Sequence, residues 1–187
     1  GVMYHPDHGT WVEVPDLSRG LCGLSRPEHF RGVCTVVLKL FMLTGADVAV
    51  FGQKDWQQQA ILRRMVRDLD VPVRIETRET VREADGLALS SRNVYLSAGE
   101  RAQAPEIRKA LLFAQKLAQS GETSVKLLRE AVLRRWAEFL PMGRLDYLSI
   151  VHPESMTPLT EVTGPALMAC AVRVGKARLI DNILLRS

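Results

Sequence analysis

Residues 48–59 read VAVFGQKDWQQQ, and they predict a buried strand that turns directly into a helix. Val48 to Phe51 is a short, continuous apolar run, as expected of a strand covered on both faces. Gly52 to Lys54 turns the chain, and Asp55 is suited to cap the helix that follows. The inner stripe of that helix recurs at helical spacing, at Ile61, Leu62, Met65, Val66 and Leu69.

The neighbouring elements extend this pattern into an alternation of helices and strands. Upstream, apolar residues at helical spacing predict a helix from Phe30 that ends near Gly45, a typical C-cap residue. Downstream, Val71 to Ile75 predicts another strand. Before the first helix, Thr10 to Val14 alternates like a short strand, and residues 16–29 resemble an irregular loop. The order helix, strand, helix, strand predicts parallel strands with crossover helices, a Rossmann-like, doubly wound α/β plan.

The character of the chain changes near residue 80. A capping box, Ser97 to Glu100, predicts a helix to about Ala118, and a second helix is expected from about Thr123 to Leu140. Three β-rich runs follow, with Gly175 and Lys176 in a tight connection between the last two. The runs are Leu145 to Val151, Ala166 to Val174 and Arg178 to Leu184. This order predicts a smaller α+β domain over residues 81–187, after an α/β domain over residues 1–80.

Composition narrows the class of protein. The 187 residues carry a net charge of +4 and show no Lys/Arg-rich run, which argues against nucleic-acid binding. No apolar run reaches the ~20 residues that cross a bilayer, so a soluble protein is expected. Three cysteines without a CxxC pair indicate free thiols and a reducing cytoplasm rather than disulfides or zinc. The start at Gly1, without an initiator Met, suggests a fragment.

The turn after the first buried strand is the first candidate site. Open α/β sheets bind ligands where parallel strands end, and helix N-termini favour anions. Gly52 would let a ligand approach the backbone, and Lys54 could reach a phosphate. Gln58, one turn into the helix, offers both a donor and an acceptor. The alternative is structural: Asp55 as a plain N-cap, Lys54 solvated, and the glutamines as exposed polar filler.

The second candidate is the loop DGLALSSRN, residues 85–93. Adjacent hydroxyls at Ser90 and Ser91, followed by Arg92, suit a phosphate because hydroxyls and a guanidinium donate several hydrogen bonds. The alternative is a polar interdomain linker in which Asn93 is a turn residue.

The third candidate is RPEHFRG, residues 26–32, at the start of the predicted helix. His29 and Arg31 could contact a ligand there. Three valines follow at helical spacing, and they suit either the core or the floor of a pocket for a branched aliphatic group: Val33, Val36 and Val37. His5 and His8 lack the further ligands of a metal site, so no metal site is expected in the protein itself.

RPEHFRGV, FGQKDWQQ and GLALSSRN, in this order and spacing, closely resemble the pantothenate synthetase (pantoate–β-alanine ligase) family. IVHPESMTPL and ARLIDN also fit its C-terminal domain. The resemblance implies the nucleotidyltransferase fold of class I tRNA synthetase cores and an ATP-dependent joining of pantoate to β-alanine through pantoyl adenylate. It further implies Mg²⁺ with the ATP and a homodimer. The family's N-terminal HxGH motif is absent, which implies that this polypeptide carries about half of an active site and has little activity alone.

The resemblance also implies residue roles. Gly52 and Asp55 would hold the ribose of ATP, Gln53 would also bind ATP, and Lys54 would hold the phosphates. Val81 and Leu89 would contact ATP through their backbones, while Ser90, Ser91 and Arg92 would grip the phosphates from a mobile loop. Gln58 would hydrogen-bond pantoate, and its gem-dimethyl group would rest on Val33, Val36 and Val37. Two residues depart from the family pattern: Gln53 stands where Glu is usual, and Trp56 where Tyr or Phe is usual.

Two other classes of function stay open at this point. The chain could be a non-catalytic module that binds ATP or pantoate, which ATP titration without turnover would reveal. Its pI of about 9.2 raises RNA contact as a further alternative, although no RNA-binding motif accompanies it.

Overall fold

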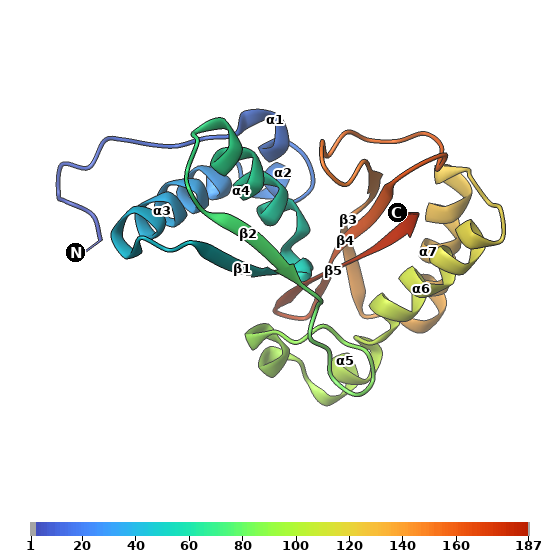
Figure 1. Ribbon diagram of the computed structural model, residues 1–187. Coiled ribbons are helices and arrows are strands. Elements are labelled where there is room, and N and C mark those ends of the chain that lie inside the picture. The colour runs from blue at the N-terminus through green and yellow to red at the C-terminus, as the bar shows by residue number, and fades with distance from the viewer. Residues whose placement is uncertain (1–2, 187) are drawn as a thin grey trace.

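The computed structural model describes residues 3–186, and its first half is built around a small parallel sheet. Strands β1 (Val48–Gly52) and β2 (Arg74–Arg78) pair in parallel, with Val48 opposite Arg74. Helix α4 (Trp56–Asp68) crosses over between them, and α3 (His29–Thr44) precedes β1 (Figure 1). The α/β plan with parallel strands is therefore confirmed.

The ends of α3 and α4 show which predicted helix boundaries were right. Gly45 adopts a left-handed conformation with φ 61° and donates its amide to Phe41, so the predicted C-cap is confirmed. The prediction that Leu69 belongs to the inner stripe of α4 is wrong, because the helix ends at Asp68 and Leu69 is 51% exposed. The remaining stripe residues, from Ile61 to Val66, pack into a hydrophobic cluster with α3.

Strand β1 is not covered on both faces, contrary to the prediction. Val48 and Val50 are 39% and 59% exposed, whereas Ala49 and Phe51 pack against the cluster beneath α3 and α4. Within residues 3–186 this sheet has two strands, and its helices contact the face that carries Ala49 and Phe51. The apolar run therefore buries only alternate side chains.

The predicted strand at residues 10–14 is also wrong. These residues form no strand with any part of the chain that the structure describes, and the Val12 amide donates to the Thr35 hydroxyl at 3.0 Å. The segment expected to be an irregular loop contains two short helices, α1 (Pro15–Ser18) and α2 (Cys22–Ser25).

Three helices lead into the second sheet. The capping box is confirmed: Ser97 and Glu100 each accept a backbone hydrogen bond at the start of α5 (Ala98–Gln103). The single helix expected to run to Ala118 is wrong, because Pro105 interrupts it and begins α6 (Glu106–Gln119). Helix α7 (Val125–Phe139) matches the second predicted helix closely.

The last three strands form an antiparallel sheet in the order β3–β4–β5, as predicted. They are β3 (Gly143–Val151), β4 (Ala166–Val174) and β5 (Ala177–Arg186). Gly175, with φ 54°, makes the tight turn between β4 and β5. Helices α6 and α7 lie along one side of this sheet, and the α3–α4 half lies on the other (Figure 1).

The antiparallel sheet belongs to two hydrophobic clusters at once. Met168 and Cys170 point into the cluster with α6 and α7, whereas Leu167 and Ala169 point into the cluster with α3 and α4. Alternate side chains of a strand leave on opposite faces, so β4 is buried on both. A domain boundary near residue 80 stays a prediction. No helix within residues 3–186 has the length and apolar character to cross a membrane.

Candidate active site

A cleft of about 380 Å³ opens between the turn after β1 and the face of the antiparallel sheet. Its walls come from α2, the start of α3, the turn η1 (Gln53–Asp55), the start of α4, η2 (Ser91–Tyr95) and the three strands β3, β4 and β5. Basic side chains from distant parts of the sequence meet there: Arg26, His29, Lys54, Arg92 and Arg178.

The cleft's described carboxylates are already paired with cations. Asp55 lies 3.7 Å from the Lys54 ammonium, and the buried Asp181 lies 2.8 Å from the Arg82 guanidinium. The guanidinium groups of Arg26 and Arg92 therefore leave the cleft with an excess of positive charge. A site of this kind favours a polyanion.

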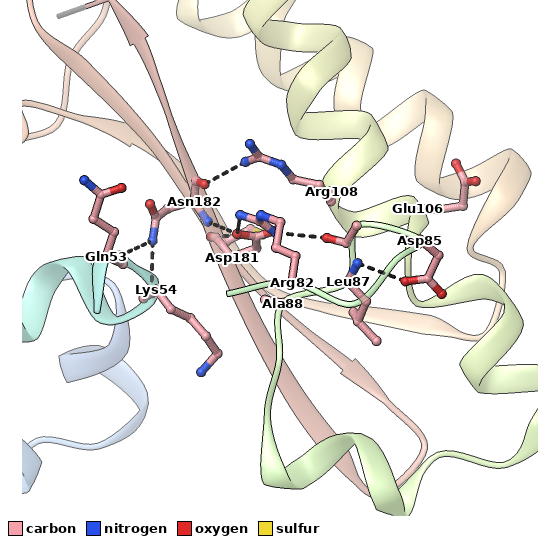
Figure 2. Close-up of polar contacts among 12 residues, drawn as sticks. Gln53, Lys54, Arg82, Asp85, Leu87, Ala88, Glu106, Arg108, Asp181 and Asn182 are labelled. Atoms are coloured by element: carbon pink, nitrogen blue, oxygen red, sulfur yellow. Dashed lines mark hydrogen bonds and ion pairs between the residues drawn. The ribbon is translucent and has the colours of Figure 1, made fainter. Parts of the chain in front are cut away.

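The Lys54 turn lies at the carboxyl end of β1. The Lys54 side chain is only 18% exposed, and Asn182 of β5 donates hydrogen bonds to the carbonyls of Gln53 and Lys54 at 2.9 and 3.0 Å (Figure 2). Asp55 occupies the N-cap position of α4, but within residues 3–186 its side chain makes no capping hydrogen bond. The prediction that Asp55 caps the helix is therefore wrong, since its carboxylate pairs with Lys54 instead.

The loop that carries the two serines is held at its base by a short antiparallel bridge between Arg82 and Ala88. Arg101 of α5 binds Asp85 at 2.5 Å and Glu83 at 2.6 Å, and these contacts hold the pKa of each carboxyl below its usual range. The loop is thus tied to α5 rather than being a free linker.

The hydroxyl and guanidinium groups of this loop take different places. The Ser90 hydroxyl accepts from the Arg92 amide at 3.2 Å, and Ser90 lines a small pocket next to Lys54. Arg92, although exposed, lines the main cleft with Lys54, whereas the exposed Ser91 lines neither of these pockets. The structure therefore brings two of the three loop residues beside Lys54.

The two residues near the start of α3 that were predicted to contact a ligand, His29 and Arg31, lie in different places. His29 lines the cleft, where burial first and the Arg26 guanidinium second lower the pKa of its ring. Arg31 lies elsewhere: it binds Glu28 at 2.8 Å and stacks over Trp11 at 4.8 Å. Only His29 is placed to meet a ligand in the cleft.

The three glutamines at the start of α4 have distinct surroundings. Gln58 and the buried Gln57 both line the cleft, whereas Gln59 is buried outside its lining. The Gln57 side chain accepts from the Cys22 amide at 3.0 Å and donates to the Leu17 and Gly20 carbonyls. The alternative of exposed polar filler is wrong for Gln57 and Gln59.

Several other predicted site residues lie outside the described lining of the cleft. The α3 valines are half-buried, and Val33 and Val37 pack against the cluster with α4. Val81 and Leu89 are exposed, and the Leu89 amide donates to the Val81 carbonyl at 2.9 Å. The outlying residues are Gly52, Gln53, Val33, Val36, Val37, Val81, Leu89 and Ser91. Their ligand roles stay predictions.

Sequence reasoning missed the contribution of β3 and β5 to the cleft. Arg178 pairs with Asp146 at 2.7 Å and lies 3.6 Å from the Cys22 sulfur. The hydroxyl of the partly buried Tyr147 lies 3.4 Å from the same sulfur, and burial raises the pKa of this tyrosine. Asp181 and Asn182 complete this side. The adjacent polar residues Asp181 and Asn182, inside the apolar run RLIDNILL, were the available signal.

Trp56 explains one departure from the family pattern. Its indole N–H donates to the Pro153 carbonyl at 2.8 Å, so the larger ring ties the start of α4 to the loop after β3.

His5 and His8 belong to no metal-binding cluster. Within residues 3–186, no group of three or more His, Cys, Asp or Glu side chains lies close enough together to hold a metal ion.

Comparisons with known proteins agree with this architecture. The family described as Pantoate-beta-alanine ligase matches residues 1–184. The chain is 82% identical over 187 residues to a pantothenate synthetase of Desulfovibrio desulfuricans, covering all of this chain and 66% of that protein. It is 59% identical over 183 residues to one of Nitratidesulfovibrio vulgaris, covering 98% and 65%. The chain therefore spans about two thirds of the length of these relatives.

Solved structures show the same fold. Pantothenate synthetase from Thermus thermophilus superposes with a TM-score of 0.94 at 45% identity, covering all of this chain and 68% of that one. A pantoate–β-alanine ligase from Francisella tularensis, complexed with beta-gamma ATP and β-alanine, superposes with a TM-score of 0.69 at 28% identity, covering 96% and 60%. The chain belongs to the pantoate–β-alanine ligase family.

Proposed function

We propose that the protein acts in the ATP-dependent condensation of pantoate with β-alanine, through a pantoyl adenylate and with release of pyrophosphate and AMP. The observation that carries this proposal is the meeting of Lys54 and Arg92 in one cleft, although 37 intervening residues separate them in sequence. The Francisella relative is complexed with an ATP compound and β-alanine, which supports the same substrates here.

The proposed roles follow the positions of the side chains. Lys54 and Arg92 hold the phosphates, helped by Ser90, which lies beside Lys54, and by Ser91 once the loop closes. Gly52 and Asp55 would hold the ribose, and Gln53 would also contact ATP. Val81 would use its amide and Leu89 its carbonyl for ATP, since the Leu89 amide and the Val81 carbonyl bind each other.

Pantoate would bind beside Gln58, which lines the cleft one turn into α4. Its gem-dimethyl group would rest on the valines of α3. The half-buried state of these side chains leaves apolar surface for that contact: Val33, Val36 and Val37.

The chemistry requires cations more than a base. A carboxylate is already ionised at pH 7, so its attack on the α-phosphate needs no proton removal. The obstacle is negative charge meeting negative charge, which positioning and fixed cations overcome. The cleft supplies cations of this kind in Lys54, Arg92 and Arg178, whereas the neighbouring His29 has a lowered pKa and is neutral at pH 7.

Mg²⁺ would enter with ATP, held by phosphate oxygens. The described cleft carboxylates, Asp55 and Asp181, are already paired with Lys54 and Arg82, so they are poor ligands for the ion.

The free thiols at Cys22, Cys34 and Cys170 support a location in a reducing cytoplasm. A homodimer is part of the proposal, and light scattering on the purified protein tests it.

Pyrophosphate release tests the proposal. We expect release that depends on pantoate, followed by pantothenate on addition of β-alanine. Lys54→Ala should lower kcat in the full-length protein roughly 10²–10³-fold, the scale of one lost transition-state contact. Lys126→Ala, on the exposed surface of α7, is the matched control and should leave kcat unchanged. Release independent of pantoate would contradict the assignment.

A non-catalytic ATP- or pantoate-binding role is the second candidate. It rests on the excess of positive charge in the cleft, which would hold a polyanion whether or not turnover follows. Calorimetric titration with ATP separates the two: clear binding without pyrophosphate release supports the binding role.

A further inference from the structure

The side chain of Asn182 connects the antiparallel sheet to the Lys54 turn. Its Nδ2 atom donates to the Gln53 carbonyl at 2.9 Å and to the Lys54 carbonyl at 3.0 Å (Figure 2). Asn182 is only 9% exposed, so these hydrogen bonds are largely shielded from water. A single amide thus holds both carbonyls of the turn from which the Lys54 side chain leaves.

Its neighbour Asp181 connects the same strand to the loop of residues 83–93. The Asp181 side chain is 3% exposed and accepts two hydrogen bonds from Arg82, at 2.8 and 2.9 Å. Arg82 also donates to the Gly86 carbonyl at 3.1 Å, and so fixes the base of the loop that carries Ser90 and Arg92. Adjacent residues of β5 therefore hold the two segments that meet at the cleft.

Asn182 is itself fixed in place. Its backbone amide donates to the Asp181 carboxylate at 2.8 Å, and its carbonyl accepts from Arg108 of α6 at 3.1 Å. The strand, the helix and the buried ion pair leave the amide little freedom. A side chain held this firmly can transmit its position to the turn that it binds.

We propose that Asn182 is a positioning residue, which sets where the Lys54 ammonium stands relative to Arg92. The inference rests on the proposed role of Lys54 in holding ATP phosphates. The two carbonyls both accept, so their common partner must present N–H donors, as an amide does. A shift of about 1 Å in a reacting group can cost on the order of 10²-fold, so loss of this anchor should be measurable.

Calorimetry with ATP on Asn182→Ala and Asn182→Asp tests the inference. The aspartate has the same shape but turns a carboxylate toward two carbonyls. We expect Asn182→Ala to weaken ATP binding about 10-fold or more. In a Lys54→Ala background the same change should alter the affinity less than about twofold, because both substitutions act through one ammonium. Equal losses in both backgrounds would overturn the positioning role and indicate general destabilisation.

Gln115→Ala is the matched control, since Gln115 also donates from a side-chain amide to a β5 carbonyl, that of Leu184, at 2.7 Å. It should change the melting temperature similarly while leaving the affinity for ATP intact. An Asn182→Ala variant that binds ATP like the wild type would overturn the inference.

Hydrogen exchange at the amides of residues 54–57, measured without ATP, separates this inference from the proposed function. Faster exchange there in Asn182→Ala supports the anchor, and unchanged exchange contradicts it. A wild-type protein that does not bind ATP refutes the nucleotide-binding role, and exchange then decides the anchor alone.

Discussion

His29 lies on the cation-rich wall of the cleft, with its ring nitrogen 3.2 Å from the Arg26 guanidinium. Burial and the positive charge of Arg26 both disfavour a proton on the ring, and so the pKa of His29 lies below its ordinary value. Because the guanidinium can only donate, Nε2 accepts from Arg26, and the neutral ring is left with its Nδ1–H as a donor for a ligand at pH 7. This is how a histidine can serve a polyanion site without adding charge.

An NMR titration of the His29 ring tests this account. Arg26→Gln should raise the pKa, because a neighbouring cation is removed, but not fully to about 6.5, because the burial remains. Arg31→Gln, on the same helix but turned toward Glu28, should leave it unchanged. If Arg26→Gln left the titration midpoint where it was, the charge of Arg26 would have no part in the shift.

The same shift has a consequence for stability. Below a pH of about 6.5, His29 binds a proton in the unfolded chain more readily than in the folded protein. The stability that the folded protein gains from a neutral His29 is therefore fully present above that pH. This stability is lost as the pH falls from about 6.5 to the pKa of His29 in the folded protein.

At the scale of elements, the loop of residues 83–93 depends on α5. Arg101 binds both Glu83 and Asp85, and Asn93 donates to Glu83 at 2.6 Å. Because the pKa of each carboxyl is lowered in the fold, these contacts persist above pH ~4 and weaken as the pH falls through the folded pKa values.

Arg101→Ala should therefore loosen the loop at neutral pH while α5 keeps its capping box. We expect trypsin to cleave after Arg92 several-fold faster than in the wild type, because local opening exposes the peptide bond. Arg129→Ala, at an exposed position of α7, is the control. Equal cleavage rates in wild type and Arg101→Ala would mean that the ion pairs do not restrain this loop.

At the scale of the whole molecule, the antiparallel sheet joins two hydrophobic clusters. Leu167 and Met168 are both fully buried, and they point into different clusters from neighbouring positions of β4. Neither cluster can lose its part of the sheet without exposing the other. Unfolding should therefore be a single transition, even if residues 1–80 and 81–187 form separate domains.

Leu167→Ala should destabilise both halves together, by about 2–5 kcal/mol, the usual cost of a buried leucine. Urea unfolding followed at single-tryptophan reporters tests this, with Trp56 in one cluster and Trp136 in the other. Leu112→Ala, at a 36% exposed position of α6, is the control. Two transitions, with only the Trp56 midpoint lowered, would show that the halves unfold independently.

Local patterns were enough for the order of elements from α3 onward, apart from the break between α5 and α6, and for three boundaries. Gly45, the Ser97–Glu100 capping box and Gly175 all lie where short-range geometry dictates them. The turn with Lys54 and the loop with Arg92 were also visible as candidate sites, since charge and strand-to-helix position are properties of neighbouring residues. Pro105 was an equally local signal, but the prediction passed over it.

Tertiary structure alone decided which residues surround the cleft. The Asn182 amide meets carbonyls that lie 128 and 129 residues away, and Arg178 meets Cys22 across 156. The exposure of Val50 and the burial of Gln57 were likewise set by distant neighbours. Periodicity predicts which side chains share a face of a helix or strand. The surface that packs against that face is decided only when the whole chain folds. Hydrophobic burial and hydrogen bonding act between surfaces that come together from any part of the sequence.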